Sequence, residues 1–215
     1  MAFYDVVVPQ TTQGTLALAA TNGATMAPPR ADNTAAGTYT FTKDPGGAPH
    51  VTVTATPNGG YVIESWPGSS VTALAGAVLK TNPSGAPSSI DLTAAATVAA
   101  PTFAQYHAVT INTVGTGTVE VAVADDASPV SGATVTVYVK HGTTVAFTKT
   151  PGAGYQYASE TGPTTISAAG SIVVTFEPVP APAPTPVPDP LLDTGVGTDD
   201  YIGHDTVNKL SLIHI

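Results

Sequence analysis

The sequence contains no cysteine, which excludes disulfide bonds, cysteine-ligated metal sites and thiol catalysis. Charged residues make up only 10% of the chain, and 6 Lys and Arg stand against 15 Asp and Glu. The net charge of −9 argues against nucleic acid and anionic membranes as partners, because both are bound through clustered basic side chains. No apolar run is long enough to span a bilayer, so we expect no membrane insertion in this segment.

Signatures of catalysis are also missing from the chain. There is no Gly-x-Ser-x-Gly elbow, no His-Glu-x-x-His helix and no phosphate-binding loop. The histidines are scattered over predicted strand edges and loops, and none has a second histidine at the short sequence spacing of a metal site. The carboxylates are separated by predicted strands, so none pairs with another as in a glycosidase. The sequence therefore predicts a protein without enzymatic activity.

What the chain does contain is one pattern that occurs twice. Residues 51–61 read Val-Thr-Val-Thr-Ala-Thr-Pro-Asn-Gly-Gly-Tyr, and residues 145–155 read Val-Ala-Phe-Thr-Lys-Thr-Pro-Gly-Ala-Gly-Tyr. Each is an alternating strand, a Pro/Gly turn and an aromatic residue that begins the next strand. We expect Pro57 and Pro151 at the second position of a tight turn, followed by a glycine with positive φ. A structural unit that occurs twice without chemistry inside it indicates a module rather than an enzyme.

Alternating apolar residues predict an all-β fold with two small antiparallel β-sheet modules in tandem. Module 1 covers residues 3–103, with an insertion at about 67–89, and module 2 covers residues 104–178. The predicted strands of module 1 are 4–8, 14–20, 38–42, 50–56, 61–66 and 97–103. Those of module 2 are 107–113, 118–124, 133–139, 144–149, 155–158 and 171–177. Residues 73–80 of the insertion are either a short helix or an extra strand.

The C-terminal part differs in composition from both modules. Alternating prolines in residues 179–190 predict a semi-rigid polyproline II linker about 40 Å long. A stiff linker separates folded parts, so we interpret residues 191–209 as the truncated start of an incomplete third domain. Residues 210–215 reverse-translate to a sequencing-adapter sequence, and we interpret them as an artefact; the alternative is a genuine apolar tail. The first predicted strand has no signal peptide before it, which suggests an exported protein whose gene start is missing.

Several short motifs carry a family resemblance over residues 3–178. They are the initial Tyr4 and Tyr106, Gly117-Thr118-Val119, Gly142-Thr143-Thr144-Val145, the shared Thr-Pro-x-x-Gly-Tyr, and the closing Phe103 and Phe176. With these motifs the two modules resemble divergent internalin-type B-repeats of bacterial surface proteins. Trp66 matches the family's Gly-Trp position, where the second copy carries Glu160. The resemblance implies a small all-β module strung in series along cell-surface or secreted proteins, often adhesins.

The segment after the linker carries a second resemblance. Asp193-Thr194-Gly195, Asp199, Ile202 and Asp205-Thr206 are similar to the start of the bacterial Ig-like repeats of giant biofilm and RTX-type adhesins. The chain departs from that pattern at Gly203-His204 and at residues 208–210. This resemblance implies an extracellular or cell-surface location.

Two functions follow as expectations. The first is a non-catalytic structural or adhesive repeat segment, a stalk or spacer, whose partners are neighbouring repeats of the same polypeptide and surface glycans or the host or biofilm matrix. The alternative is a carbohydrate-binding accessory module of a secreted polysaccharide-acting enzyme. In that case an aromatic platform would bind the sugar rings through Trp66, Tyr61, Tyr155 and Tyr157. Alternation places Trp66 on the face of Val62, which favours packing in the core instead.

Calcium at the C-terminal junction is the one cofactor that the sequence suggests. Closely spaced carboxylates suit Ca²⁺, and the candidate ligands, beside Asp189, are Asp193, Asp199, Asp200 and Asp205. The alternative is a solvated acidic linker, which the absence of EF-hand spacing favours. Asp125-Asp126 is a weaker candidate, and we expect it to form a turn.

Overall fold

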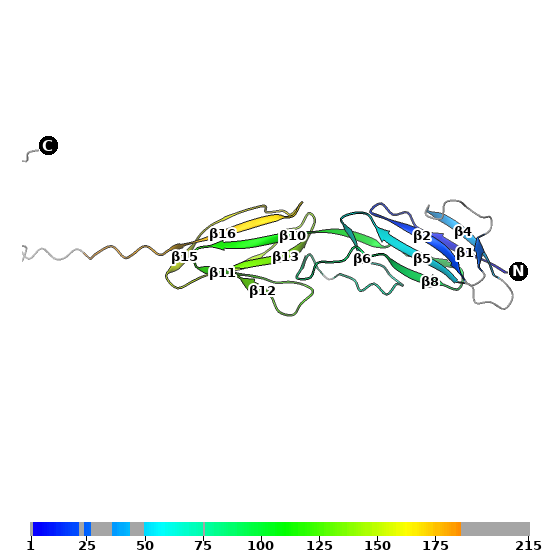
Figure 1. Cartoon of the computed structure of the whole chain (residues 1–215), viewed down its shortest axis with the longest axis horizontal. Coiled ribbons are helices and arrows are strands. Elements are labelled where there is room, and N and C mark those ends of the chain that lie inside the picture. The colour runs from blue at the N-terminus through cyan, green and yellow to red at the C-terminus, as the bar shows by residue number, and fades with distance from the viewer. Residues whose placement is uncertain (1, 22–23, 27–35, 44–49, 75, 186–215) are drawn as a thin grey trace, which may run out of the picture. The chain divides into compact units, whose positions relative to one another are not determined.

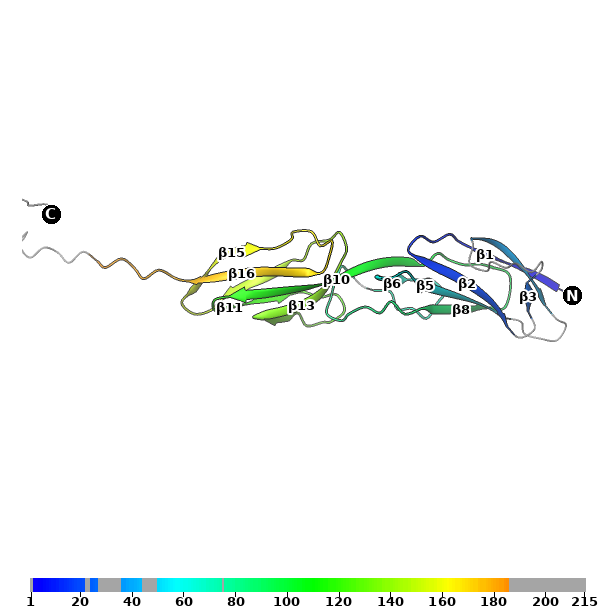
Figure 2. The same cartoon turned by 45° about the horizontal axis from the view of Figure 1, so that its top comes forward.

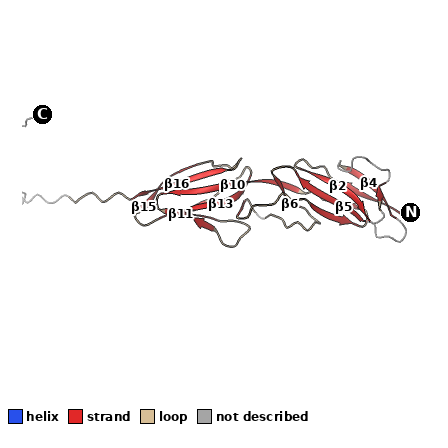
Figure 3. Cartoon of the chain, in the orientation of Figure 1, coloured by secondary structure: helices blue, strands red, loops and turns tan. Residues whose placement is uncertain are grey.

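A computed structural model describes residues 2–21, 24–26, 36–43, 50–74 and 76–185. These residues form strands and loops without a helix, which confirms the predicted all-β class (Figure 3). The chain divides into two units, Met1–Val179 and Pro180–Ile215, and all the described strands lie in the first.

The first hydrophobic core lies between two sheets with the strand orders β3-β4-β1-β9 and β2-β5-β8. In β5, Val51, Val53 and Ala55 are fully buried and the threonines between them are more exposed, because side chains alternate across a strand. We call this part the N-terminal lobe. Its strands are β1 (Ala2–Val8), β2 (Gly14–Thr21), β3 (Thr25–Met26), β4 (Gly37–Lys43), β5 (His50–Pro57), β6 (Tyr61–Ser65), β8 (Ser88–Leu92) and β9 (Ala96–Thr97).

The second core lies between sheets with the strand orders β15-β16-β10-β13-β7 and β12-β11-β14. Valines of β11 and β13 face each other across it, together with Ile111, Ile172 and Phe176. We call this part the C-terminal lobe. Its own strands are β10 (Thr102–Val114), β11 (Gly117–Val121), β12 (Val130–Gly132), β13 (Thr134–Lys140), β14 (Phe147–Pro151), β15 (Tyr155–Thr161) and β16 (Gly170–Pro178). The short strand β7 (Val78–Leu79) joins its sheet from the segment between β6 and β8 of the N-terminal lobe.

Strand β10 belongs to both lobes (Figure 1, Figure 2). Its first residues, Thr102–Gln105, pair with β6, and the residues from Tyr106 onward pair with β13 and β16. The sequence predicted two strands here, 97–103 and 107–113, and this division is wrong. Neither glycine nor proline interrupts residues 102–114, so nothing ends the strand between the lobes.

The twice-occurring turn differs in one respect from the expected geometry. The N–H of Tyr61 donates to the carbonyl of Asn58, so the turn begins after Pro57, which is the last residue of β5. In the second copy Pro151 likewise ends β14. The expected place of proline inside the turn is therefore wrong. The positive φ is present, at Gly60 (83°) and at its counterpart in the second copy, Gly154 (77°).

The two lobes pair their strands in corresponding ways. β1 pairs antiparallel with β4 and parallel with β9, and β10 pairs antiparallel with β13 and parallel with β16. β2 pairs with β5 so that Gly14 lies opposite Pro57, and β11 pairs with β14 so that Gly117 lies opposite Pro151. A Cβ atom on Gly14 would meet the ring of Phe103 at 2.4 Å, and one on Gly117 would meet the ring of Phe176 at 2.4 Å. In both lobes glycine makes room for a closing phenylalanine.

Candidate functional site

The insertion that follows β6 adds a strand to the C-terminal lobe. Val78 and Leu79 form β7 and pair antiparallel with the end of β13. The N–H of Lys140 donates to the carbonyl of Ala77 at 2.8 Å, and the N–H of Ala124 donates to the carbonyl of Val78 at 2.9 Å. Residues 73–80, whose sequence allows either a helix or a strand, thus contain a short strand, and its hydrogen-bond partners lie in the C-terminal lobe.

Two carboxylates of the C-terminal lobe hold the end of this segment. Asp125 accepts hydrogen bonds from the backbone N–H groups of Lys80 at 2.6 Å and Thr81 at 2.8 Å. Burial raises the pKa of Asp125, but these N–H groups outweigh it, and the net pKa lies below its ordinary value. Asp126 forms an ion pair with the Lys80 side chain and accepts the N–H of Ser128, and both contacts lower its pKa. The expected turn thus also fastens the insertion.

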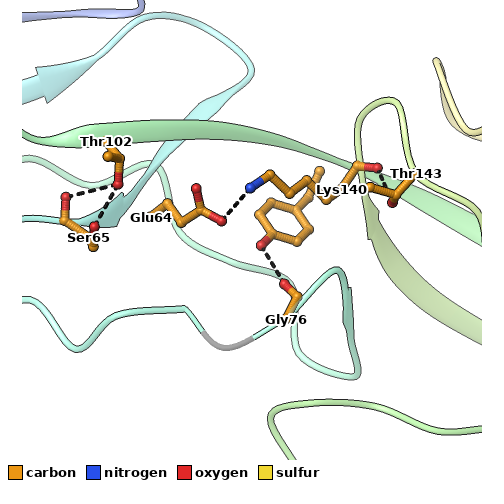
Figure 4. Close-up of polar contacts among 7 residues, drawn as sticks. Glu64, Ser65, Gly76, Thr102, Lys140 and Thr143 are labelled. Carbon is orange, nitrogen blue, oxygen red and sulfur yellow. Dashed lines mark hydrogen bonds and ion pairs between the residues drawn. The ribbon is translucent and has the colours of Figure 1, made fainter.

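Side chains connect the lobes beside β10 as well (Figure 4). Glu64 of β6 and Lys140 of β13 form an ion pair at 2.6 Å, with 22% and 36% of their side chains exposed. The hydroxyl of Tyr106 donates to the carbonyl of Gly76 at 3.0 Å. Burial and, second, the charge of Glu64 raise the pKa of that hydroxyl. We call β7, the Lys80 contacts, the Glu64–Lys140 pair and the Tyr106–Gly76 bond together the interlobe clamp.

A pocket of about 520 Å³ lies beside the clamp. Apart from Asp125, its lining carries no ionisable side chain, and the oxygens of Asp125 already accept backbone N–H groups. Leu79 of β7 lies at its wall and is 1% exposed. The other residues around it are Thr72, Ala73, Leu74, Thr81, Asn82, Pro83 and Ser84. This lining offers apolar contact and hydroxyl groups rather than an acid–base pair.

The aromatic residues proposed for sugar binding lie in different surroundings. Trp66 is 2% exposed in the N-terminal core, and its Nε1 donates to the carbonyl of Ala99 at 2.9 Å. Tyr61 on β6 and Tyr155 on β15 are half-buried in separate lobes, and Tyr157 is 45% exposed. A sugar ring could stack on Trp66 only after the core had opened.

The proposed calcium ligands Asp193, Asp199, Asp200 and Asp205, and Asp189 beside them, lie outside the described residues. Within the described part of the chain, no group of three or more His, Cys, Asp or Glu side chains could hold a metal ion.

One close pair of ionisable side chains has no signal in the sequence. His107 Nε2 and His141 Nδ1 lie 3.0 Å apart, although 34 residues separate them in the chain. His107 is on β10, and His141 directly follows β13, so the antiparallel pairing of these strands brings the rings together. Burial and, second, the charge of His141 lower the pKa of His107. Only the strand register could have revealed this pair, because sequence spacing gives no sign of it.

The chain was compared with protein-family models, curated proteins and solved structures. No protein-family model, curated protein or solved structure matches the chain. In the portion that the structure describes, no helix is long and apolar enough to cross a membrane.

Proposed function

We propose that residues 3–178 are a non-catalytic structural or adhesive repeat segment, a stalk or spacer, of a larger bacterial cell-surface or secreted protein. The observation that carries the proposal is the interlobe clamp. A spacer holds a distance only if its successive modules are fixed to one another. Here the backbone of the N-terminal lobe contributes β7 to the sheet of the C-terminal lobe. Two ion pairs, Lys80–Asp126 and Glu64–Lys140, and the hydrogen bond from the Lys80 N–H to Asp125 fasten the same junction.

The corresponding strand pairing supports two copies of one module in series. Gly14 faces Pro57 and contacts Phe103, and the same relation holds among Gly117, Pro151 and Phe176. Each glycine leaves the space that a closing phenylalanine fills, so the twice-occurring pattern has a packing role. A spacer built from B-repeat-like modules needs the same packing in each copy. A spacer needs no catalytic residue.

Strand β10 is suited to carry tension along the chain. β10 has 13 residues and makes backbone ladders in both lobes, so tension on one lobe passes into the other through one continuous strand. Beyond β16, residues 180–185 are exposed and form no strand. This is what we expect of a proline-rich spacer. The partners in this proposal are neighbouring repeats of the same polypeptide and, at the surface, glycans or matrix.

The test is to locate the segment on cells that produce the whole protein. Antibodies raised against residues 3–178 are applied to intact and to permeabilised cells, and protease shaving of intact cells is followed by mass spectrometry. We expect labelling and release of peptides from intact cells. Labelling that appears only after permeabilisation would contradict the proposal. A glycan array probed with the wild-type chain and with Tyr157→Ala separates the alternative function, since loss of binding in that variant without loss of stability would favour a carbohydrate module.

A further inference from the structure

His107 and His141 place two imidazole nitrogens at a spacing that suits a bidentate metal site. The facing nitrogens are 3.0 Å apart, and the ring centroids are 5.3 Å apart with planes inclined by 56°. Two nitrogens bonded at about 2.0–2.1 Å to one ion lie about 3.3 Å apart at the tetrahedral angle and about 2.9 Å apart at a right angle. The observed spacing falls between these values, and turning each ring by about 35–45° from its hydrogen-bonded direction would aim both nitrogen lone pairs at one ion.

Backbone contacts fix the chain at both histidines. His107 lies opposite Val139 in the β10–β13 ladder, and the N–H of His141 donates to the carbonyl of Gln105 at 2.8 Å. The two imidazoles are therefore held near each other before an ion arrives, which reduces the ordering cost of binding. His141 is exposed and His107 is half-buried, so water can complete the coordination shell.

The local charge is also compatible with a cation. Lys140, next to His141, has its ammonium group paired with Glu64, and the chain as a whole carries a net charge of −9. One imidazole now donates a hydrogen bond to the other, so one facing nitrogen bears a proton. On binding, that proton moves to the far nitrogen of its own ring, both facing nitrogens become ligands, and both rings stay neutral.

We propose that His107 Nε2 and His141 Nδ1 together bind a divalent ion of the imidazole-preferring class, such as Zn²⁺ or Ni²⁺, with water in the remaining positions. The site would join β10 to the turn after β13 and stabilise the C-terminal lobe next to the clamp. Ca²⁺ would not bind there, because it takes oxygen ligands.

The experiment is a titration of the full chain with ZnCl₂ and, separately, with NiCl₂ near neutral pH. Zinc binding is followed by the NMR signals of the histidine ring nitrogens and by thermal melting against EDTA. We expect His107 Nε2 and His141 Nδ1 to shift together, and zinc at ten times its Kd to raise the melting temperature by about 3–6 °C. CaCl₂ at the same concentration is expected to leave both ring signals in place.

Variants assign the effect to the pair. His107→Gln and His141→Gln are each expected to abolish the zinc-dependent rise in melting temperature, and His50→Gln, in the other lobe, to leave it unchanged. His141→Gln keeps the fold testable because that side chain is exposed. The proposal is overturned if zinc leaves the two ring signals unmoved, or if the rise in melting temperature survives in both folded variants. Failure here leaves the spacer proposal standing, because surface location does not depend on metal.

Discussion

Replacing Leu79 by alanine tests whether the insertion of the N-terminal lobe stabilises the C-terminal lobe. Leu79 is 1% exposed and pairs with Tyr138 of β13. Truncating a fully buried leucine to alanine costs about 2–5 kcal/mol, and more where the cavity stays empty. Leu79 also lines the open pocket of about 520 Å³, which water can fill. We therefore expect the lower part of that range, about 2–3 kcal/mol.

The assay is hydrogen exchange with mass spectrometry on β13, together with urea unfolding followed by the fluorescence of Trp66, the single tryptophan of the chain. A loss of about 2–3 kcal/mol corresponds to exchange at β13 that is about 30- to 150-fold faster in Leu79→Ala. Trp66 lies in the other core, so its transition reports the N-terminal lobe separately.

The matched control is Val114→Ala on β10. Val114 is 54% exposed, so its truncation is expected to stay within about 0.5 kcal/mol of the wild type. If β13 exchanges as slowly in Leu79→Ala as in this control, the buried Leu79 side chain of β7 does not stabilise the C-terminal lobe. The reasoning about the clamp would then be refuted.

Three further predictions concern other contacts. Gly117→Ala is expected to destabilise the chain by about 1–3 kcal/mol in urea unfolding, because the added Cβ would meet the Phe176 ring at 2.4 Å, and Phe176→Leu in the same chain should recover part of that loss; equal stability of Gly117→Ala and wild type would contradict the packing. A double-mutant cycle of Glu64→Gln and Lys140→Met is expected to give a coupling of about 1 kcal/mol that decreases with salt, and additive effects would show that the half-exposed pair contributes nothing. The pKa of His107 is lower in the folded chain than its ordinary value of 6.5, so the neutral ring stabilises the fold above pH 6.5 and this contribution is lost as the pH falls through the lower folded pKa. Between pH 7.5 and 5 the melting temperature should therefore fall more steeply for wild type than for His107→Gln, and an equal fall in both would contradict this.

The sequence predicts the strands well where apolar residues alternate, as in β5 and β13, because one buried face imposes a period of two. The sequence does not predict which residues of the two lobes occupy equivalent positions in the strands. The shared motif makes Tyr4 and Tyr106 equivalent, yet Tyr4 is buried in the core with Val6, whereas the buried core residues of β10 are Val109 and Ile111, and alternation places Tyr106 on the opposite face. A slip of one residue moves a side chain to the other face of a sheet.

The junction could be predicted least. β7 has only two residues, and no period can be recognised over that length. Its partners in β13 lie about 60 residues further along the chain, as the pairing of Leu79 with Tyr138 shows. The histidine pair depends on the same long-range register. Local patterns thus identify the modules, and tertiary pairing decides how they are joined.

The most direct test of the account is whether the two lobes move as one body. Residual dipolar couplings of backbone N–H groups are measured on the weakly aligned full chain, separately for strands of each core. If the interlobe clamp holds, the couplings of both lobes fit one alignment tensor. Two tensors of different magnitude would show that the lobes reorient independently, and the proposal of a rigid spacer would be contradicted.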